Sequence, residues 1–188
     1  MPSAGDGDAD GELIQRFLGG DERAFEALMD KYYGRISRLA ARILGNSAGA
    51  EDIAQEVFLR AARGFVGFRG DASVLTWLSR IAVNLSLTAL HRQRAQSTVS
   101  AEVESRPAIG DAGAEVEQRR RQTTVRAAID ALPVNYRVAL VLSGVEEFEY
   151  HEIAEVLGVP IGTVKSRISV GKQLLRDKLL PLLESGRL

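Results

Sequence analysis

Short polar and basic side chains gather near the end of the chain, just after a glycine turn. Lys165, Ser166 and Ser169 fall on one side of a helix drawn at about 100° per residue, and Arg167 falls on its flank. Ammonium, guanidinium and hydroxyl groups donate hydrogen bonds to phosphate oxygens and to base edges. From Lys165 to the C-terminus there are six basic residues against two acidic ones, an excess of four. This pattern predicts a surface that contacts nucleic acid.

The segment around this set has the layout of a helix-turn-helix. A short helix is expected over residues 150–157, Gly158 allows a sharp turn, and a second helix begins at Pro160. Ala154 is small where the two helices approach, and Pro181 is expected to end or kink the second helix. The second helix buries a stripe that consists of Val164, Ile168, Gly171, Leu175 and Leu179. Its free face suits a DNA major groove about 12 Å wide. The alternative is a helical hairpin with a solvated basic face.

A second set of side chains forms an acidic ridge in the first half of the chain. Ser47 is expected to cap a helix whose apolar side holds Ile53, Val57 and Ala61. The opposite side holds Asp52, Gln55, Glu56 and Leu59. Residues spaced by three and four share one helix face, so the ridge suits a partner helix that carries arginine. The alternative is an ordinary solvated face.

The composition excludes several kinds of chemistry. The chain has no cysteine, so disulfides, thiolate catalysis and cysteine-ligated metals are excluded, and its two histidines, His91 and His151, stand sixty residues apart. We therefore expect no metal site and no cofactor. The acidic run Glu146, Glu147 and Glu149 beside His151 could serve a hydrolase, but a solvated acidic turn is the favoured interpretation.

Length and periodicity predict an all-α fold of two small helical domains joined by a flexible linker. The chain has 188 residues, 45% of them hydrophobic, and a formal net charge of −1. Residues 1–11 read as a disordered acidic tail. Helical periodicity then supports a first domain over 12–95, with Phe65 and Phe68 anchoring a loop, and fails over a linker at 96–118. The second domain, 119–188, is the helix-turn-helix domain. No segment reads as a secretory signal or a membrane span, so we expect a cytoplasmic protein without membrane insertion.

Several segments together resemble the extracytoplasmic-function, or group IV, sigma factors of bacterial RNA polymerase, within the sigma-70 family. In the first domain they are residues 20–25, 50–58, 68–78 and 80–84. In the second they are Leu132-Pro133, Tyr136-Arg137, residues 152–154 and residues 162–167. The resemblance extends from Glu12 to Leu183. It implies that the first domain is sigma region 2 and the second is region 4.

The resemblance also implies roles for the residues that match the motifs. Asp52, Gln55, Glu56 and Leu59 would bind the clamp helices of the largest polymerase subunit, and the flap would hold region 4. The minus-ten element would meet Arg69, Asp71, Ser73, Thr76, Trp77, Arg80, Asn84 and Thr88. In this set a loop captures a flipped base and Trp77 acts as support. The minus-thirty-five element would meet Thr163, Lys165, Ser166, Arg167 and Ser169. Thr88 and Ser169-Val170 depart from the common family pattern, which affects promoter preference.

The function expected from the resemblance is that of an alternative sigma factor. It would bind core RNA polymerase, recognise and melt promoter DNA, catalyse no reaction, and be held by an anti-sigma factor. The main alternative is a stand-alone helix-turn-helix transcriptional regulator. That alternative leaves the ridge at Asp52 and the stretch from Phe68 to Asn84 unexplained.

Overall fold

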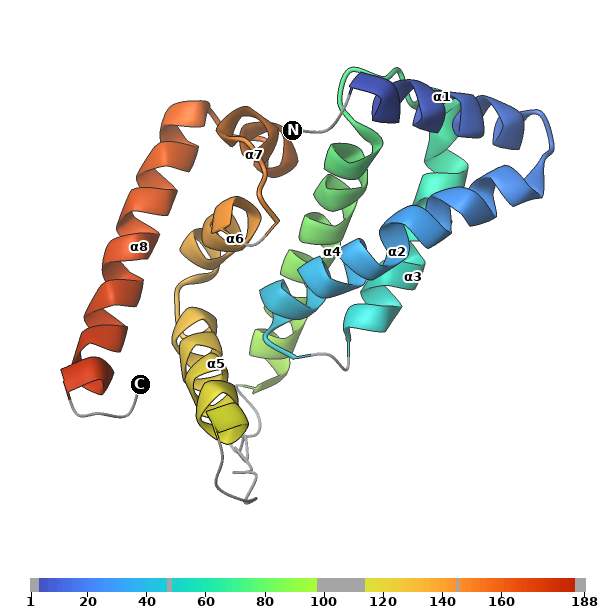
Figure 1. Cartoon of the computed structure of the whole chain (residues 1–188). Coiled ribbons are helices and arrows are strands. Elements are labelled where there is room, and N and C mark those ends of the chain that lie inside the picture. The colour runs from blue at the N-terminus through green and yellow to red at the C-terminus, as the bar shows by residue number, and fades with distance from the viewer. Residues whose placement is uncertain (1–3, 47–48, 98–113, 145, 185–188) are drawn as a thin grey trace.

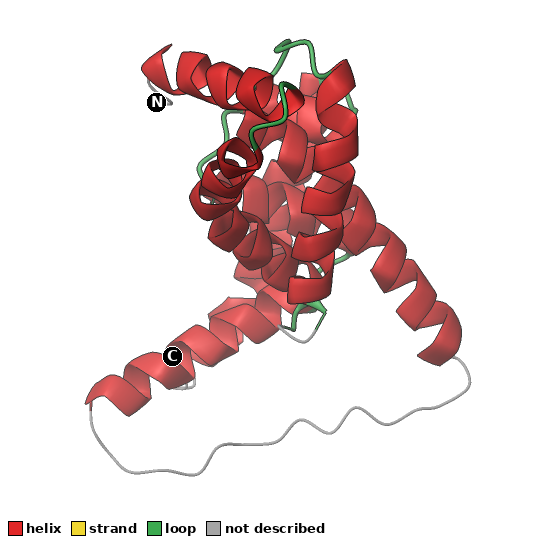
Figure 2. Cartoon of the chain, turned by 90° about the vertical axis from the view of Figure 1, so that its right-hand side faces the viewer, coloured by secondary structure: helices red, strands yellow, loops and turns green. Residues whose placement is uncertain are grey.

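The computed structural model describes residues 4–46, 49–97, 114–144 and 146–184, which contain helices and loops and no strand (Figures 1 and 2). The first half contains α1 (Ala4–Leu18), α2 (Glu22–Leu44), α3 (Ala50–Gly64), the short 3-10 helix η1 (Phe65–Gly67) and α4 (Val74–Ser97). The second half contains α5 (Ala114–Asp130), α6 (Val134–Gly144), α7 (Tyr150–Leu157) and α8 (Ile161–Glu184). None of these helices is long and apolar enough to cross a membrane.

Helix α2 is the central element of the first half. Asp21 caps its first turn by accepting a hydrogen bond from the Arg23 amide at 3.1 Å, and Gly45 ends it in the left-handed conformation at φ 78°. A hydrogen bond from Arg16 holds the pKa of Asp21 below its ordinary value. The buried stripe of α2 includes Leu28, Tyr32, Ile36, Leu39, Ala40 and Ile43. Helices α1, α3 and α4 pack around it, so the expected helical periodicity of this segment is confirmed.

The expected disordered tail is wrong for residues 4–11, because α1 already begins at Ala4. Asp10 is buried, and it accepts hydrogen bonds from the Lys31 ammonium at 2.7 Å and from the Tyr32 hydroxyl. Ile14 is buried one turn later. These contacts with α2 order a Gly-rich and Asp-rich segment whose own helix propensity is low.

Three other boundaries differ from the expectations. The cap of α3 is Gly49, whereas Ser47 lies outside the described residues. Helix α5 begins at Ala114, so the second domain starts before Arg119 and the end of the expected linker is helical; residues 98–113 lie outside the described residues. Pro181 does not end α8, which continues to Glu184.

The helix-turn-helix expected in the second half is present. Gly158 adopts φ 62°, and the Val159 amide donates to the Ala154 carbonyl at 3.1 Å, which closes the turn between α7 and α8. Val164, Ile168 and Gly171 are buried on the inner face of α8, while Leu175 and Leu179 are only half-buried. A Cβ at Gly171 would lie 3.0 Å from Leu140, so α6 and α8 approach closely at this position.

The two halves pack against each other. Helix α6 lies against α2, and α7 lies against α4, as Figure 1 shows. Buried residues of both halves, such as Val83 of α4 and Val138 of α6, belong to one continuous apolar cluster. At the end of α2, a Cβ on Gly45 would lie 3.1 Å from Asp130 of α5. Burial raises the pKa of Asp130, and the nearby Arg137 acts in the opposite direction.

Candidate nucleic-acid and protein interfaces

The acidic ridge lies on the exposed side of α3. Val57 and Ala61 are buried against the core, while Asp52, Gln55 and Leu59 are exposed and Glu56 is partly exposed. The Glu56 carboxylate accepts a hydrogen bond from Arg60 at 2.7 Å. Leu59 is 57% exposed and adds an apolar side chain to this charged face. The structure therefore gathers the four residues on one accessible face.

Val66 is a second exposed apolar side chain near the end of α3, and the sequence did not single it out. It follows Leu59 by seven residues, in η1, and is 80% exposed. The preceding residue, Phe65, is buried in the core. Because Phe65 anchors the short helix, the neighbouring Val66 is held outward. In the sequence, Phe65 and Val66 are simply two apolar residues in a segment that reads as a loop. Nothing there shows which of the two is exposed.

The loop before α4 is organised by Ser73 and Thr76. The Ser73 hydroxyl accepts a hydrogen bond from the Thr76 amide at 3.1 Å and lies 2.8 Å from the Thr76 hydroxyl. This contact satisfies an amide of the first helical turn, as a cap does. Arg69 and Asp71 are exposed on either side of Gly70, which adopts φ 75°. Thr76 itself is buried, so its hydroxyl faces protein in this structure.

Trp77 packs against the aromatic residues that hold the loop before α4. Its ring lies 5.2 Å from that of Phe65 and 5.4 Å from that of Phe68, measured between ring centroids. A Cβ at Gly64 would lie 2.9 Å from the Trp77 ring. The indole is thus clamped between the end of α3 and the loop. These contacts fit the supporting role expected for Trp77.

Arg80, Asn84 and Thr88 form an exposed row along α4. The Thr88 hydroxyl donates a hydrogen bond to the Asn84 carbonyl of the same helix at 2.8 Å. This hydroxyl proton is therefore already used within α4. An exposed arginine and asparagine at i and i+4 can reach one nucleic-acid backbone or base edge together.

The polar face of α8 is divided between open and partly covered side chains. Lys165, Ser166 and Ser169 are exposed, while Thr163 and Arg167 are half-buried. A groove of about 540 Å³ runs beside them; its lining includes Tyr136, Thr163, Ser166 and Arg167. Hydroxyl and guanidinium donors around such a groove suit a phosphate or a base edge.

A smaller pocket of about 190 Å³ brings the two sets of expected DNA contacts together. Asn84 and Leu87 of α4 line one side of it, and Leu157, Val159 and Arg167 of the second half line the other. Two residues assigned to separate promoter elements therefore lie at one boundary between the halves.

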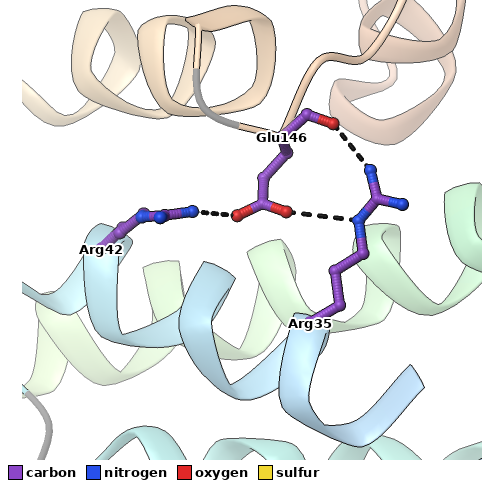
Figure 3. A network of polar contacts seen from close by, with 3 residues as sticks. All are labelled: Arg35, Arg42 and Glu146. Atoms are coloured by element: carbon purple, nitrogen blue, oxygen red, sulfur yellow. Dashed lines mark hydrogen bonds and ion pairs between the residues drawn. The ribbon is translucent and has the colours of Figure 1, made fainter. Parts of the chain in front are cut away.

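Glu146 joins the two halves through contacts with two arginines of α2 (Figure 3). Its carboxylate accepts hydrogen bonds from Arg42 and, at 3.3 Å, from the Arg35 Nε, and the Arg35 Nη2 donates to its backbone carbonyl at 2.7 Å. Glu147, Glu149 and His151 are exposed, and Glu147 adopts φ 57°. The acidic run thus does not converge on one point as a hydrolytic site would require.

The comparisons with known proteins agree with this arrangement. Residues 28–96 match sigma-70 region 2, and residues 122–175 match sigma-70 region 4. The RNA polymerase sigma-H factor of Pseudomonas aeruginosa is 37% identical over 94% of this chain and 97% of its own length. The ECF RNA polymerase sigma factor SigW of Bacillus subtilis is 35% identical over 90% of this chain and 96% of its own length.

Two solved structures have the same fold. The sigma factor RpoE of Bartonella quintana, in complex with the anti-sigma factor NepR, aligns with a TM-score of 0.66 at 22% identity, over 82% of this chain and 96% of that chain. CnrH, in complex with the cytosolic domain of CnrY, aligns with a TM-score of 0.66 at 27% identity, over 95% and 99%. Both regions of the family occur here, over residues 28–96 and 122–175, and the relatives align over 90% or more of the chain. The chain belongs to the sigma-70 family, among its extracytoplasmic-function (ECF) factors.

Proposed function

We propose that this chain is an alternative sigma factor that carries core RNA polymerase to its promoters through three separate surfaces. The observation that carries the proposal is that the expected contacts lie on exposed faces of three different helices. The ridge of α3 faces away from the core, the row from Arg80 to Thr88 runs along α4, and Lys165 and Ser166 stand open on α8. A stand-alone regulator would need only the last of these surfaces.

The ridge of α3 is proposed to bind the clamp helices of the largest polymerase subunit. Asp52, Gln55 and Glu56 supply acceptors for a basic partner helix, and Leu59 supplies apolar area at the same face. Interface energy is usually concentrated in a few such apolar anchors surrounded by polar residues. Region 4 is proposed to be held by the polymerase flap.

The loop before α4 and the row along α4 are proposed to open the minus-ten element. Unstacking a base costs a few kcal/mol, so a preformed pocket must offer contacts that the duplex cannot make. The rigid support by Trp77 and the Ser73 cap provide such preformation around Arg69 and Asp71. Thr163, Lys165, Ser166, Arg167 and Ser169 are proposed to read the minus-thirty-five element.

Three further properties are proposed from membership of the family. The chain is proposed to act in the cytoplasm, to catalyse no reaction itself, and to be inhibited by an anti-sigma factor. The complexes of RpoE with NepR and of CnrH with CnrY support this last partner.

Run-off transcription with purified core polymerase tests the proposal. The wild-type chain is expected to initiate at defined start sites, and Leu59→Ala is expected to weaken core binding about tenfold, or about 1.4 kcal/mol, because it removes an apolar anchor. Leu18→Ala is the matched control, since Leu18 is also exposed but lies in α1.

A second pair of variants tests the face of α8. Lys165→Ala is expected to reduce promoter-specific initiation several-fold with unchanged core binding, whereas Lys178→Ala, which changes an exposed lysine on another side of α8, is expected to leave initiation unchanged. Tight promoter binding by the chain alone, with no initiation in the presence of core polymerase, would favour the stand-alone regulator instead.

A further inference from the structure

We propose that the face of α2 that carries Arg35 and Arg42 is a docking surface for the second half of this same chain, with Glu146 as its anchor. The contact holds the free protein in a closed arrangement in which α4 is partly covered. This inference rests on the proposed function only for its consequence in transcription. The closed contact itself is a property of the isolated chain.

The electrostatics of Glu146 make it an anchor. Its side chain is 5% exposed, and a buried carboxylate is costly unless hydrogen-bonded and paired. Both of its carboxylate oxygens accept hydrogen bonds from guanidinium groups of α2, which lies more than a hundred residues earlier in the chain. Arg35 and Arg42 remain 39% and 36% exposed. Separation of the halves would return all three charged groups to water, so the closed arrangement is held by a contact that can be broken.

The loop that presents Glu146 is held from both sides. Within the second half, the Glu146 amide donates to the Val141 carbonyl at 3.2 Å, and the Phe148 amide donates to the Leu142 carbonyl at 3.0 Å. On the α2 side, the Arg35 guanidinium lies 5.7 Å from the centre of the Phe148 ring, in cation-π range. The arginine thus contacts a carboxylate, a backbone carbonyl and an aromatic ring of one loop, which makes the docking geometry specific.

A second contact covers one side of α4. The Thr76 hydroxyl donates to the Glu152 carboxylate of α7 at 3.5 Å, and Val83 and Leu87 line the small pocket shared with the second half. At about 100° per residue, Thr76, Val83 and Leu87 fall within about 40° of one another around α4. Arg80, Asn84 and Thr88 lie in the adjacent sector of the helix surface, which spans roughly 80° around the α4 axis. The second half therefore lies immediately beside the proposed minus-ten contacts.

The two sets of expected DNA contacts meet at this boundary. Asn84 and Arg167 line one pocket of about 190 Å³. Promoter elements named for positions ten and thirty-five are separated by about 25 base pairs, or roughly 85 Å at about 3.4 Å per pair. Residues that line one pocket cannot occupy both elements. The halves must therefore separate before the promoter is bound.

The ridge of α3 stays accessible in the closed arrangement. Asp52, Gln55 and Leu59 are exposed, and the main packing partners of α3 are α2, α4 and η1 of its own half. The closed chain can thus meet polymerase through α3 first and separate afterwards. The contacts of Glu146 would then determine how readily the two halves separate.

Fluorescence transfer between the halves tests the contact without polymerase. The absence of cysteine allows two dyes to be attached to Glu26→Cys in α2 and Lys178→Cys in α8, both exposed positions. The free wild-type chain is expected to show a dominant high-transfer state. Glu146→Gln is expected to lower the ratio of closed to open molecules about tenfold, because it removes a charge-assisted contact. Glu147→Gln, the same change at an exposed neighbour, is the control and is expected to match the wild type.

Charge exchange gives a rescue. Arg42→Glu is expected to open the chain, and its combination with Glu146→Arg is expected to restore part of the high-transfer state. The same variants are then assayed in run-off transcription, where Glu146→Gln is expected to reach half-maximal activity at a several-fold lower concentration. Equal transfer in Glu146→Gln and Glu147→Gln would overturn the docking contact. A different outcome is also possible: Glu146→Gln lowers the transfer, but the wild-type chain supports no transcription. That outcome would refute the proposed function and would still support the docking contact.

Discussion

At the scale of single residues, Asp10 is buried at the junction of α1 and α2 with two donors. Lys31 neutralises its charge at 2.7 Å, and the Tyr32 hydroxyl donates to its second oxygen. Burial of the hydroxyl, together with this hydrogen bond to Asp10, raises the pKa of Tyr32 from its ordinary value of 10.0 to about 12. The position of α1 on the core is therefore linked to the protonation of one tyrosine.

This linkage predicts a loss of stability at high pH. Between pH 10 and about 12 the unfolded chain loses the Tyr32 proton while the folded chain keeps it, so the free energy of unfolding falls as pH rises through that range. Below pH 10 the contribution is fully present. Its size is about 3 kcal/mol, from about 1.4 kcal/mol for each of about two pKa units. Tyr32→Phe removes this fall and also lowers stability at neutral pH by about 1 kcal/mol through the lost hydrogen bond.

Urea unfolding at a series of pH values measures the effect. Tyr33→Phe is the control, since the Tyr33 ring stacks on Phe58 with 5.8 Å between centroids and is not the donor to Asp10. An identical dependence on pH in Tyr32→Phe and in the wild type would contradict the linkage.

At the scale of elements, most helices could be predicted from hydrophobic spacing, and α1 could not. The stripe of α2, the turn at Gly158 and the inner face of α8 follow directly from apolar residues at three- and four-residue spacing. In α1, Leu13, Ile14 and Phe17 have the same spacing, but the glycines and aspartates before them indicate disorder. Only the partners on α2 reveal that Asp10 is buried, and these partners belong to tertiary structure.

Helix α1 is accordingly expected to be part of the stable fold. Ile14→Ala should cost about 2–5 kcal/mol, the usual range for truncating a buried aliphatic side chain, whereas Leu18→Ala on the exposed side of the same helix should change stability by less than about 0.5 kcal/mol. Denaturant unfolding followed by circular dichroism compares the two variants. Equal, small effects would indicate that α1 does not pack on the core in solution.

At the scale of the whole molecule, the sequence predicts two helical domains but is silent on how they meet. The three nearby glutamates, Glu146, Glu147 and Glu149, look equivalent in sequence. The fold buries Glu146, because α2 brings two arginines to that point from more than a hundred residues away. Hydrophobic periodicity also fails to mark Val83, which lines the pocket between the domains together with Val138 of the second domain. Contacts between domains depend on docking and leave no local pattern.

The closed arrangement is expected to respond to salt. Because Arg35 and Arg42 are more than a third exposed, their attraction to Glu146 is partly screened, and the Debye length falls from about 10 Å at 0.1 M salt to about 3 Å at 1 M. Small-angle X-ray scattering should show the radius of gyration of the free wild-type chain rising over this range. Glu146→Gln should begin with a larger radius and change little. A wild-type radius independent of salt would mean that apolar packing alone holds the halves together.

The left-handed backbone of Glu147 gives the loop between α6 and α7 a further property. A side chain with a Cβ is disfavoured at φ 57° by about 1–2 kcal/mol relative to the right-handed region, whereas glycine tolerates it. The residue that follows the anchor therefore carries a small conformational cost in this loop. Glycine at this position would remove that cost from the folded loop.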